Sequence, residues 1–434
     1  MRRMLQFIGV GLVVAVLFTS FGLGGALAAG PSATPTPDNP QSVPNGPWLQ
    51  DDQTVSLASI MTNEDLYAKL QHLAEISKGR MTLEVAGYSN APVDDLMQPV
   101  GYPLYVCKFG DNSDAKVKVF ITSQIHGNEV LGTQAAVDLM QKLIAGGKEV
   151  DDILSKVSIW IMPRINPDGA AYTVNGERYP IRYSLGAWDP VSFGLLAGTK
   201  APWYYSSRYQ GYDQNRDYSP DVNFRINDTN KAAVEAALND RTKNNSNYGG
   251  FYVTPEARIV TKVFTEFHPD IYLDLHHRGF NTLSDTDDRS VSIQVAADVA
   301  EPYTDPFTGK HYEVSPEVLK LAKQVNAVGW LALQKGDSSI GAIQKYPKVN
   351  LPGTSLGAFA LNNTAIMLIE VKGQTQSLGQ KEAGQLTMVV RQAVWGVLSS
   401  VADGSIYSVD PAIYDAIPES ANSISSPHDA ADGL

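Results

Sequence analysis

The stretch KVKVFITSQIHGNE, residues 116–129, joins the pattern of a buried strand to a turn and to the start of a helix. Its first part is apolar and β-branched, which is typical of a strand inside a sheet. Gly127 and Asn128 then predict a turn, and the apolar spacing beyond them predicts a helix opened by Glu129. Ligands of open α/β sheets bind where strands end. We therefore expect His126 and Glu129 side by side at such an edge.

Outward from this stretch, short apolar strand patterns and helix patterns alternate between about residue 55 and residue 402. Such alternation predicts one large α/β domain over 55–402, with a mixed, mostly parallel twisted sheet and helices on both faces. Residues 183–250 are polar and aromatic, and we expect them to form a long surface excursion. Strands are predicted at 81–88, 103–109, 116–123, near 160, near 273 and near 368, and helices at 63–79, 129–143, 316–334 and 382–401.

The two ends of the chain differ from this pattern. Arg2 and Arg3 precede an uncharged run, and small residues up to Ala28 follow it, which is the order of a secretory signal at 1–28. The run is also long enough for an N-terminal membrane anchor. Residues 29–54 read as a Pro-rich linker and residues 403–434 as a polar tail. The sequence thus predicts a secreted, extracellular protein.

Composition argues against nucleic-acid binding and excludes structures that need several cysteines. The 434 residues carry 34 Lys and Arg against 46 Asp and Glu, a net charge of −12, which disfavours a general nucleic-acid binder. The only cysteine is Cys107, so an intramolecular disulfide and a multi-cysteine metal site are both excluded.

Histidines and one glutamate offer ligands for a metal. His126 and Glu129 can reach one ion from the end of a strand, although a turn histidine beside a helix-start glutamate is the ordinary alternative. The strand pattern LDLHH at 273–277 adds His276. Two histidines and one carboxylate leave a fourth position for water, which is the composition of a hydrolytic zinc site. His72 and Glu75 repeat the spacing within a helix pattern, where we expect a solvated face.

Two further motifs could act on a substrate. Glu370 lies in the apolar strand pattern TAIMLIEVKG, where a carboxylate is costly unless it is functional or paired with Lys372. The run DQNRD at 213–217 contains an Arg fork and an adjacent amide, which suit a carboxylate ligand, although it could equally be a polar loop.

Five motifs occur in the order found in the M14 zinc carboxypeptidase family, which the chain resembles over roughly residues 55–400. They are HGNE at 126–129, NPDG at 166–169, YDQNRDY at 212–218, LDLHHRG at 273–279 and LIEVKG at 368–373. Each motif is short, and their shared order makes the resemblance specific.

The resemblance implies one Zn²⁺ per chain and a set of site residues. It makes His126, Glu129 and His276 the zinc ligands. The catalytic pair would be Glu370, as general base and acid, and Arg208, which would stabilise the oxyanion; Arg178 and Arg182 are alternatives to Arg208, because an insertion follows NPDG. The residues implied to bind or orient are Asn215 and Arg216 at the substrate's terminal carboxylate, Tyr346 over the substrate, and Asp213 behind the first histidine ligand.

The function implied is that of a secreted metallocarboxypeptidase, which hydrolyses the C-terminal bond of a peptide or protein with a free carboxylate. A cell-wall peptide amidase or peptidase of the same family is an alternative. The run GTSLG at 353–357 also fits the nucleophile elbow of serine hydrolases, with Ser355, Asp410 and His428 as a possible triad. A binding domain without activity is a third reading, disfavoured because all three ligands and Glu370 are present.

Overall fold

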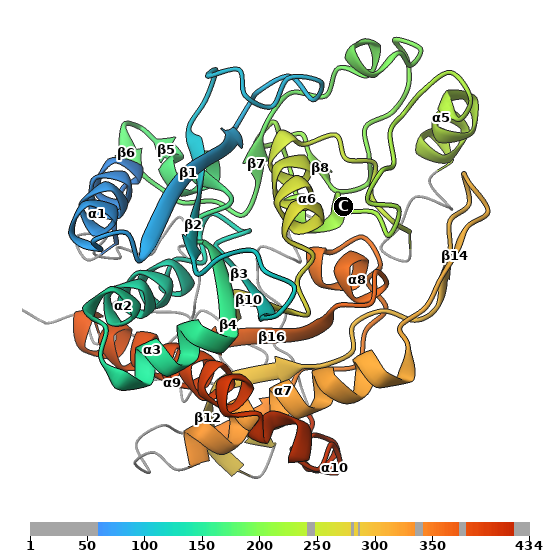
Figure 1. The fold of residues 1–434 in the computed structure, drawn as a ribbon. Helices are drawn as coiled ribbons and strands as arrows, with labels where there is room; N and C mark the ends of the chain where they lie inside the picture. Colours follow the sequence, from blue (N-terminus) through green and yellow to red (C-terminus); the bar gives the residue numbers. More distant parts are fainter. Residues whose placement is uncertain are drawn as a thin grey trace, which may run out of the picture. The chain divides into compact units, whose positions relative to one another are not determined.

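The stretch that ends in His126 forms strand β3 (Val117–Ser123), which lies within a mixed sheet (Figure 1). The structure is a computed structural model, and it describes residues 60–240, 248–278, 282–284, 287–334, 342–372 and 379–420. The predicted signal, the linker and the end of the tail lie outside these ranges. Within them, no helix combines the length and the apolar character needed to cross a bilayer.

Nine strands of the described residues form this sheet, in the order β1-β2-β4-β3-β10-β16-β12-β11, with β15 beside β12. The central strands β4, β3, β10 and β16 run parallel, whereas β1, β2, β11 and β12 make antiparallel pairs on the two sides. The predicted fold class is therefore confirmed. The remaining strand bounds are β1 (Met81–Tyr88), β2 (Pro103–Phe109), β4 (Val157–Met162), β10 (Ile271–Arg278), β11 (Thr282–Ser284), β12 (Asp287–Ala296), β15 (Ala342–Lys345) and β16 (Ala365–Lys372).

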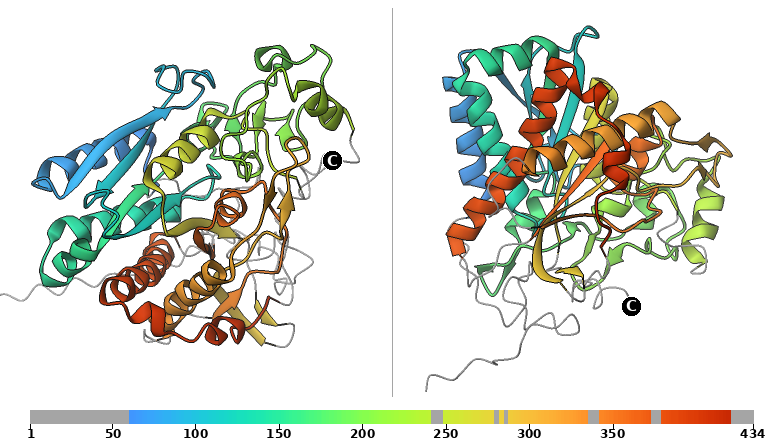
Figure 2. Two further views of the ribbon diagram at one scale, coloured as in Figure 1. Left: turned by 45° about the vertical axis from the view of Figure 1, so that its right-hand side comes forward. Right: turned by 90° about the horizontal axis from the view of Figure 1, so that it is seen from below.

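Helices cover both faces of the sheet, and each face has its own apolar core (Figures 1 and 2). One core lies under α1, α2, α3, α7 and α9, and the other lies under α6 and α8. Burial of this apolar surface, at about 25 cal/mol per Å², is the main source of stability. The bounds are α1 (Asn63–Ile76), α2 (Leu131–Ala145), α3 (Lys148–Lys156), α6 (Pro255–Phe267), α7 (Pro316–Gln334), α8 (Ser355–Ala360) and α9 (Gly379–Asp403).

Side-chain alternation along β10 separates its two histidines. Leu273 belongs to the core on the α2 face, and Tyr272 belongs to the core on the α6 face. Because successive side chains of a strand point to opposite faces, His276 lies on the α6 face and His277 on the α2 face. His277 Nε2 accepts a hydrogen bond from the backbone N–H of Leu131, 2.7 Å away. Only His276 is thus left for the site on the α6 face.

The predicted helices are present with small shifts at their ends. The first begins at Asn63 because Thr62 and Asp65 form a capping box, and it ends at Ile76, before Gly79 with its φ of +85°. The predicted helix at 129–143 begins two residues later than expected, at Leu131. Glu129 therefore belongs to the turn before α2.

The packed core extends beyond residue 402, where the sequence predicted the domain to end. Ile406, Tyr414 and Ile417 are buried in the same core as α7 and α9. They follow α9 in a 3₁₀ turn (Ser405–Ser408) and in α10 (Ala412–Asp415). Part of the segment at 403–434, which the sequence predicts to be a polar tail, thus contributes core residues as far as Ile417.

A buried carboxylate, Asp217, joins the excursion over residues 183–250 to the segment that follows it, and apolar side chains of the excursion pack into the core on the α6 face. The described residues of the excursion form short elements: β7 (Ser184–Leu185), a 3₁₀ helix (Pro190–Phe193), β8 (Tyr205–Ser206), β9 (Gly211–Tyr212), a 3₁₀ turn at Gln214–Arg216 and α5 (Lys231–Asn239). Asp217 Oδ1 accepts hydrogen bonds from Tyr204 Oη (2.6 Å) and Val253 N (3.0 Å), and its Oδ2 accepts two from Thr254, both of 2.7 Å. These four bonds fix the turn that carries Asn215 and Arg216.

We expect Asp217→Ala to lower the free energy of unfolding by about 3 kcal/mol, because each buried donor left without an acceptor costs about 1–3 kcal/mol. Urea unfolding followed by circular dichroism measures the change. Asp95→Ala, at an exposed position, is the matched control and should change the free energy by less than about 0.5 kcal/mol. Equal effects of the two substitutions would contradict the anchoring role of Asp217.

Candidate metal centre and active site

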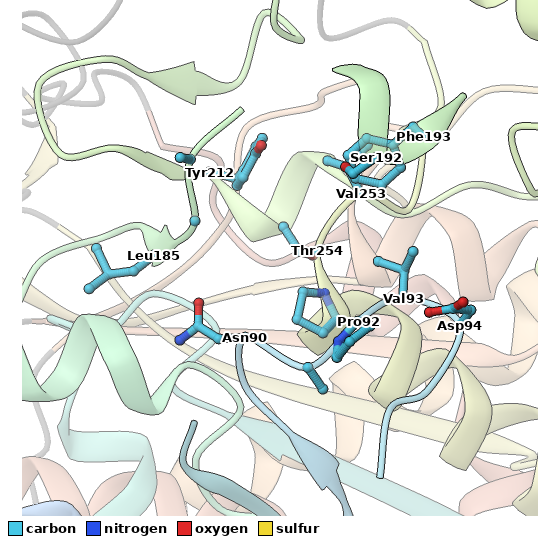
Figure 3. Close-up of a pocket in the computed structure, with 14 residues that line it drawn as sticks. Asn90, Pro92, Val93, Asp94, Leu185, Ser192, Phe193, Tyr212, Val253 and Thr254 are labelled. Atoms are coloured by element: carbon cyan, nitrogen blue, oxygen red, sulfur yellow. The ribbon is translucent and has the colours of Figure 1, made fainter. Parts of the chain in front are cut away.

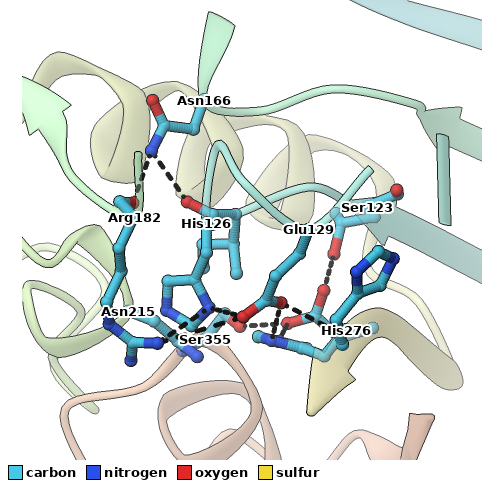
Figure 4. Close-up of polar contacts among 12 residues, drawn as sticks. Ser123, His126, Glu129, Asn166, Arg182, Asn215, His276 and Ser355 are labelled. Atoms are coloured by element: carbon cyan, nitrogen blue, oxygen red, sulfur yellow. Dashed lines mark hydrogen bonds and ion pairs between the residues drawn. The ribbon is translucent and has the colours of Figure 1, made fainter. Parts of the chain in front are cut away.

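Three buried side chains converge at the carboxyl edge of the sheet, two from the turn after β3 and one from β10 (Figure 4). They are His126, which follows β3, Glu129 in the turn before α2, and His276 on β10. One ligand atom from each lies within 4.8 Å of the others. His126 Nδ1 is 2.6 Å from Glu129 Oε1, and His276 Nδ1 is 3.0 Å from Glu129 Oε2. The two Nδ1 atoms thus face one carboxylate.

The turn that places His126 and Glu129 is held against the NPDG motif. Asn166 Nδ2 donates to the carbonyl groups of Ile125 (3.1 Å) and Arg182 (3.0 Å). Gly127 touches the backbone of Gly169 so closely that a Cβ at this position would overlap it. Glycine is therefore required here for close approach of two backbones, which explains the pairing of HGNE with NPDG.

Each histidine is oriented from behind by a second carboxylate. His126 Nε2 is 3.3 Å from Asp213 Oδ1, and His276 Nε2 is 2.9 Å from Asp274 Oδ2. A carboxylate on the far ring nitrogen is the usual support of a metal-binding imidazole, because it selects the tautomer and the ring orientation. Both Nδ1 atoms are thereby directed to the same point.

Asp274 is itself fixed by hydroxyl groups. Thr122 Oγ1 donates to its Oδ1 (2.8 Å) and Ser355 Oγ donates to its Oδ2 (2.9 Å). Burial alone would raise the pKa of Asp274, but His276 and these hydroxyls hold it below its usual value. Asp274 therefore remains a carboxylate.

The electrostatics of the three converging residues favour a cation. Burial would raise the pKa of Glu129, yet His126 and His276 hold that pKa well below its usual range. Conversely, Asp274 and Glu129 raise the pKa of His276 against the opposing effect of burial. Two imidazole nitrogens and one carboxylate, supported from behind by Asp213 and Asp274, fit the donor set of a Zn²⁺ site that keeps a fourth position for water.

Glu370 lies beside His276 on the neighbouring strand. The two residues are paired in the parallel register of β10 and β16, so their side chains share the α6 face. Glu370 is 8% exposed, and its Oε2 has no hydrogen-bond partner among the described residues. Burial raises the pKa of Glu370 to about 7. The predicted alternative, an ion pair with Lys372, is therefore disfavoured.

Of the three arginines considered from the sequence, Arg182 is the one that contacts this centre. Its Nε and one terminal nitrogen lie 3.0 and 2.9 Å from Asp213 Oδ2, and its other terminal nitrogen lies 3.3 Å from His126 Nδ1. Arg208 is exposed and stacks over the ring of Tyr209, 5.1 Å from its centroid. Arg178 donates to backbone carbonyl groups at residues 60 and 61.

Asn215 and Arg216 lie in the 3₁₀ turn that follows Asp213. Asn215 Oδ1 accepts a hydrogen bond from Ser355 N (3.1 Å), which leaves its amide N–H groups as donors. Figure 4 shows Asn215 and Arg182 together on the His126 side of the centre. Tyr346 is partly buried and lies under the guanidinium of Arg278, 5.5 Å from the ring centroid.

The structure disfavours Ser355 as a nucleophile. It is fully buried at the first position of α8, after a loop rather than a strand, and its hydroxyl donates to Asp274. His428 of the candidate triad lies outside the described residues. His72 and Glu75 are both exposed on α1, as predicted.

A cavity of about 410 Å³ lies apart from the converging residues (Figure 3). Pro92, Val93, Phe193, Tyr212 and Thr254 are among its lining residues. None of the metal-ligand candidates, nor Glu370, contributes to that lining. The cavity is therefore distinct from the centre described above.

A family model described as zinc carboxypeptidase matches residues 66–292 of the chain, which include His126, Glu129, Asn215, Arg216 and His276. The chain belongs to the zinc carboxypeptidase family. Its relatives include carboxypeptidase B of the crayfish Astacus astacus, 33% identical over 20% of this chain and 29% of that protein. Carboxypeptidase E of Caenorhabditis elegans is 29% identical over 31% of this chain and 26% of that protein. The matches thus span less than a third of these relatives' own lengths.

Two solved structures share the fold. Carboxypeptidase A from Helicoverpa armigera aligns with a TM-score of 0.52 and 16% identity, over 82% of this chain and 78% of that one. Bovine thrombin-activatable fibrinolysis inhibitor, solved with a tick carboxypeptidase inhibitor, aligns with a TM-score of 0.50 and 16% identity, over 80% of this chain and 98% of that one. The likeness supports the α/β carboxypeptidase fold of this member of the family.

Sequence reasoning missed two charged residues of the centre, Asp274 and Arg278. Both lie on β10 at positions two residues from His276, so strand alternation puts all three on one face. A polar residue at every second position of an otherwise apolar strand was the signal that could have found them.

We expect Asp274→Asn to weaken zinc binding by about 10–100-fold, because the amide supports the His276 tautomer less well than a carboxylate. Competition with a chromophoric chelator measures the affinity. Asp151→Asn, a surface carboxylate change on α3, is the matched control and should leave zinc affinity unchanged. Unaltered affinity in Asp274→Asn would contradict the orienting role.

Proposed function

We propose that this protein is a zinc-dependent metallocarboxypeptidase that removes the C-terminal residue from peptides or proteins with a free carboxylate. The observation that carries the proposal is the convergence of His126 Nδ1, His276 Nδ1 and the Glu129 carboxylate, with Glu370 in register beside His276. Membership of the zinc carboxypeptidase family supports the same reaction.

His126, Glu129 and His276 would hold the metal, which fits their donor atoms and their support by Asp213 and Asp274. When bound, Zn²⁺ supplies a Lewis acid that polarises a carbonyl group and acidifies water. The two imidazoles keep their Nδ1 atoms in position, because the Nε2 atom of each ring faces a carboxylate, Asp213 for His126 and Asp274 for His276.

Glu370 would move the proton of the reaction. Its buried carboxylate, with a pKa raised to about 7, can accept a proton from the attacking water and return it to the leaving amine. Because the ionised form accepts the proton, the base is present above that pKa and is lost as the pH falls below it. A bound cation nearby would shift this range downward.

Arg182 would stabilise the oxyanion in place of Arg208. Its guanidinium is held by Asp213 and has a terminal nitrogen beside His126 Nδ1, close to where the substrate carbonyl would lie. Preorganised donors of this kind are worth about 3–4 kcal/mol in the transition state.

Asn215 and Arg216 would bind the terminal carboxylate of the substrate, with Tyr346 closing over it. An amide donor beside a planar cationic fork matches the geometry of a carboxylate. This recognition restricts cleavage to the chain end. A cell-wall peptide with a free carboxylate would satisfy the same contacts and is included in the substrate tests.

We also propose that the enzyme is exported, on the basis of the signal-like residues 1–28 and the Pro-rich stretch at 29–54. The acidic net charge of −12 disfavours nucleic acid as a partner.

The central test compares the wild type with Glu370→Gln on a blocked dipeptide and on its C-terminal amide. We expect the wild type to hydrolyse the free acid, to lose activity with phenanthroline and to regain it with Zn²⁺. Glu370→Gln should retain zinc and lose at least about 1000-fold in kcat, since both proton transfers depend on it. Zinc content by mass spectrometry is the control. Turnover retained in Glu370→Gln, or equal cleavage of the amide, would contradict the proposal.

A second test separates the two arginines. Arg182→Met should lower kcat about 100–1000-fold, the effect of removing one oxyanion donor, while Arg208→Met should change it less than twofold. Steady-state kinetics at matched zinc content measures both. The reverse order of effects would restore Arg208 to the role that the sequence predicted.

A further inference from the structure

Arg278, the last residue of β10, is a buried cation whose guanidinium lies over the ring of Tyr346 and has no salt bridge among the described residues. Its exposed fraction is 9%, and its Nε and one terminal nitrogen have no hydrogen-bond acceptor among the described residues. Unpaired charges are costly to bury, so such a group is retained only where something else binds it. Nothing in the proposed reaction uses it.

Arg278 belongs to the face of the sheet that carries the candidate active site. It follows His276 by two residues, so the two side chains point to the same side. In the parallel register it pairs with Lys372, which follows Glu370 by two residues and is 6% exposed. Two buried cationic side chains therefore end neighbouring strands directly beyond His276 and Glu370. The guanidinium of Arg278, with donors to spare, is suited to an anion.

The surroundings of Arg278 differ from those of the other arginines of the site. Arg182 and Arg216 act electrostatically on Asp213, on the His126 side of the centre, where Figure 4 also shows Asn215. Arg278 lies over Tyr346, a ring on which Arg216 and Arg182 also act, and it acts electrostatically on Glu370. Arg278 is therefore the arginine of the site that neighbours the candidate general base.

A bound peptide would need to meet Arg216 as well as Arg278. With its terminal carboxylate at Asn215 and Arg216 and its scissile carbonyl at the metal ligands, the preceding residue would lie on the side of Glu370 and Arg278. We propose that Arg278 binds a carboxylate of the residue on the N-terminal side of the scissile bond, so that the enzyme prefers glutamyl or aspartyl residues at the penultimate position. This inference rests on the proposed carboxypeptidase function and adds its substrate class.

The test compares two blocked dipeptides that differ only in charge, one with Glu and one with Gln before a C-terminal Phe. We expect the zinc-loaded wild type to prefer the Glu peptide at least tenfold in kcat/KM, as a charge-assisted hydrogen bond would give. Arg278→Gln should abolish the preference, Arg278→Lys should keep part of it, and the exposed control Arg225→Gln should leave it intact.

Thermal unfolding supplies a readout that separates binding from a structural role. Arg278→Gln removes a buried charge two of whose nitrogens have no hydrogen-bond acceptor among the described residues, so its Tm should equal or exceed that of the wild type at equal zinc content. A merely structural arginine would instead lower the Tm on replacement. A lowered Tm with an unchanged Glu-to-Gln ratio would overturn the inference.

Binding distinguishes failure of this inference from failure of the proposed function. Calorimetry on zinc-loaded Glu370→Gln should show the Glu peptide binding at least tenfold more tightly than the Gln peptide, and the double variant with Arg278→Gln should show no difference. Hydrolysis of both peptides at equal rates would overturn the acidic preference and leave the carboxypeptidase function standing. Absence of hydrolysis together with preferential binding would overturn the function and support the anion site.

Discussion

The parallel alignment of β3, β10 and β16 is the constraint on which the rest of the structure depends. Parallel strands place their carboxyl ends at one edge, so the turn after β3 and the last residues of β10 and β16 meet there. The register of β10 and β16 then sets His276 beside Glu370. A shift of one residue in either strand would send one of these side chains to the opposite face. The apolar cores on both faces hold that register in place.

Burying so many charged groups at one edge of the sheet costs stability, and pairing the carboxylates with donors or cations limits that cost. Glu129 is shared by two imidazoles, Asp213 by Arg182 and His126, and Asp274 by two hydroxyls and His276. Each carboxylate therefore has a compensating donor or cation within its reach. Glu370 and Arg278 each keep a buried side-chain atom that has no hydrogen bond among the described residues. A buried polar atom without a hydrogen-bond partner can bind a group of the substrate.

Much of the fold and most of the centre could be predicted from the sequence, because both depend on local patterns. The apolar run before His126 and the alternation before His276 predict strands whose ends carry ligands, and Glu370 stands out within an apolar strand. The contact of Arg182 with this centre could not be predicted in this way, since the chain between NPDG and DQNRD contains an insertion and distance along it says little about distance in space. The core beyond residue 402 was missed for a similar reason: Ile406, Tyr414 and Ile417 are scattered in short turns without a helical or strand period.

The central claim is that His126, Glu129 and His276 form a zinc site with nitrogen and oxygen ligands only. X-ray absorption at the zinc edge of the purified, zinc-loaded protein tests it most directly. We expect two imidazole nitrogens and further oxygen ligands, all at about 2.0–2.2 Å, with one imidazole lost in His276→Ala. A sulfur ligand at about 2.3 Å, or an imidazole count that His276→Ala leaves unchanged, would contradict it.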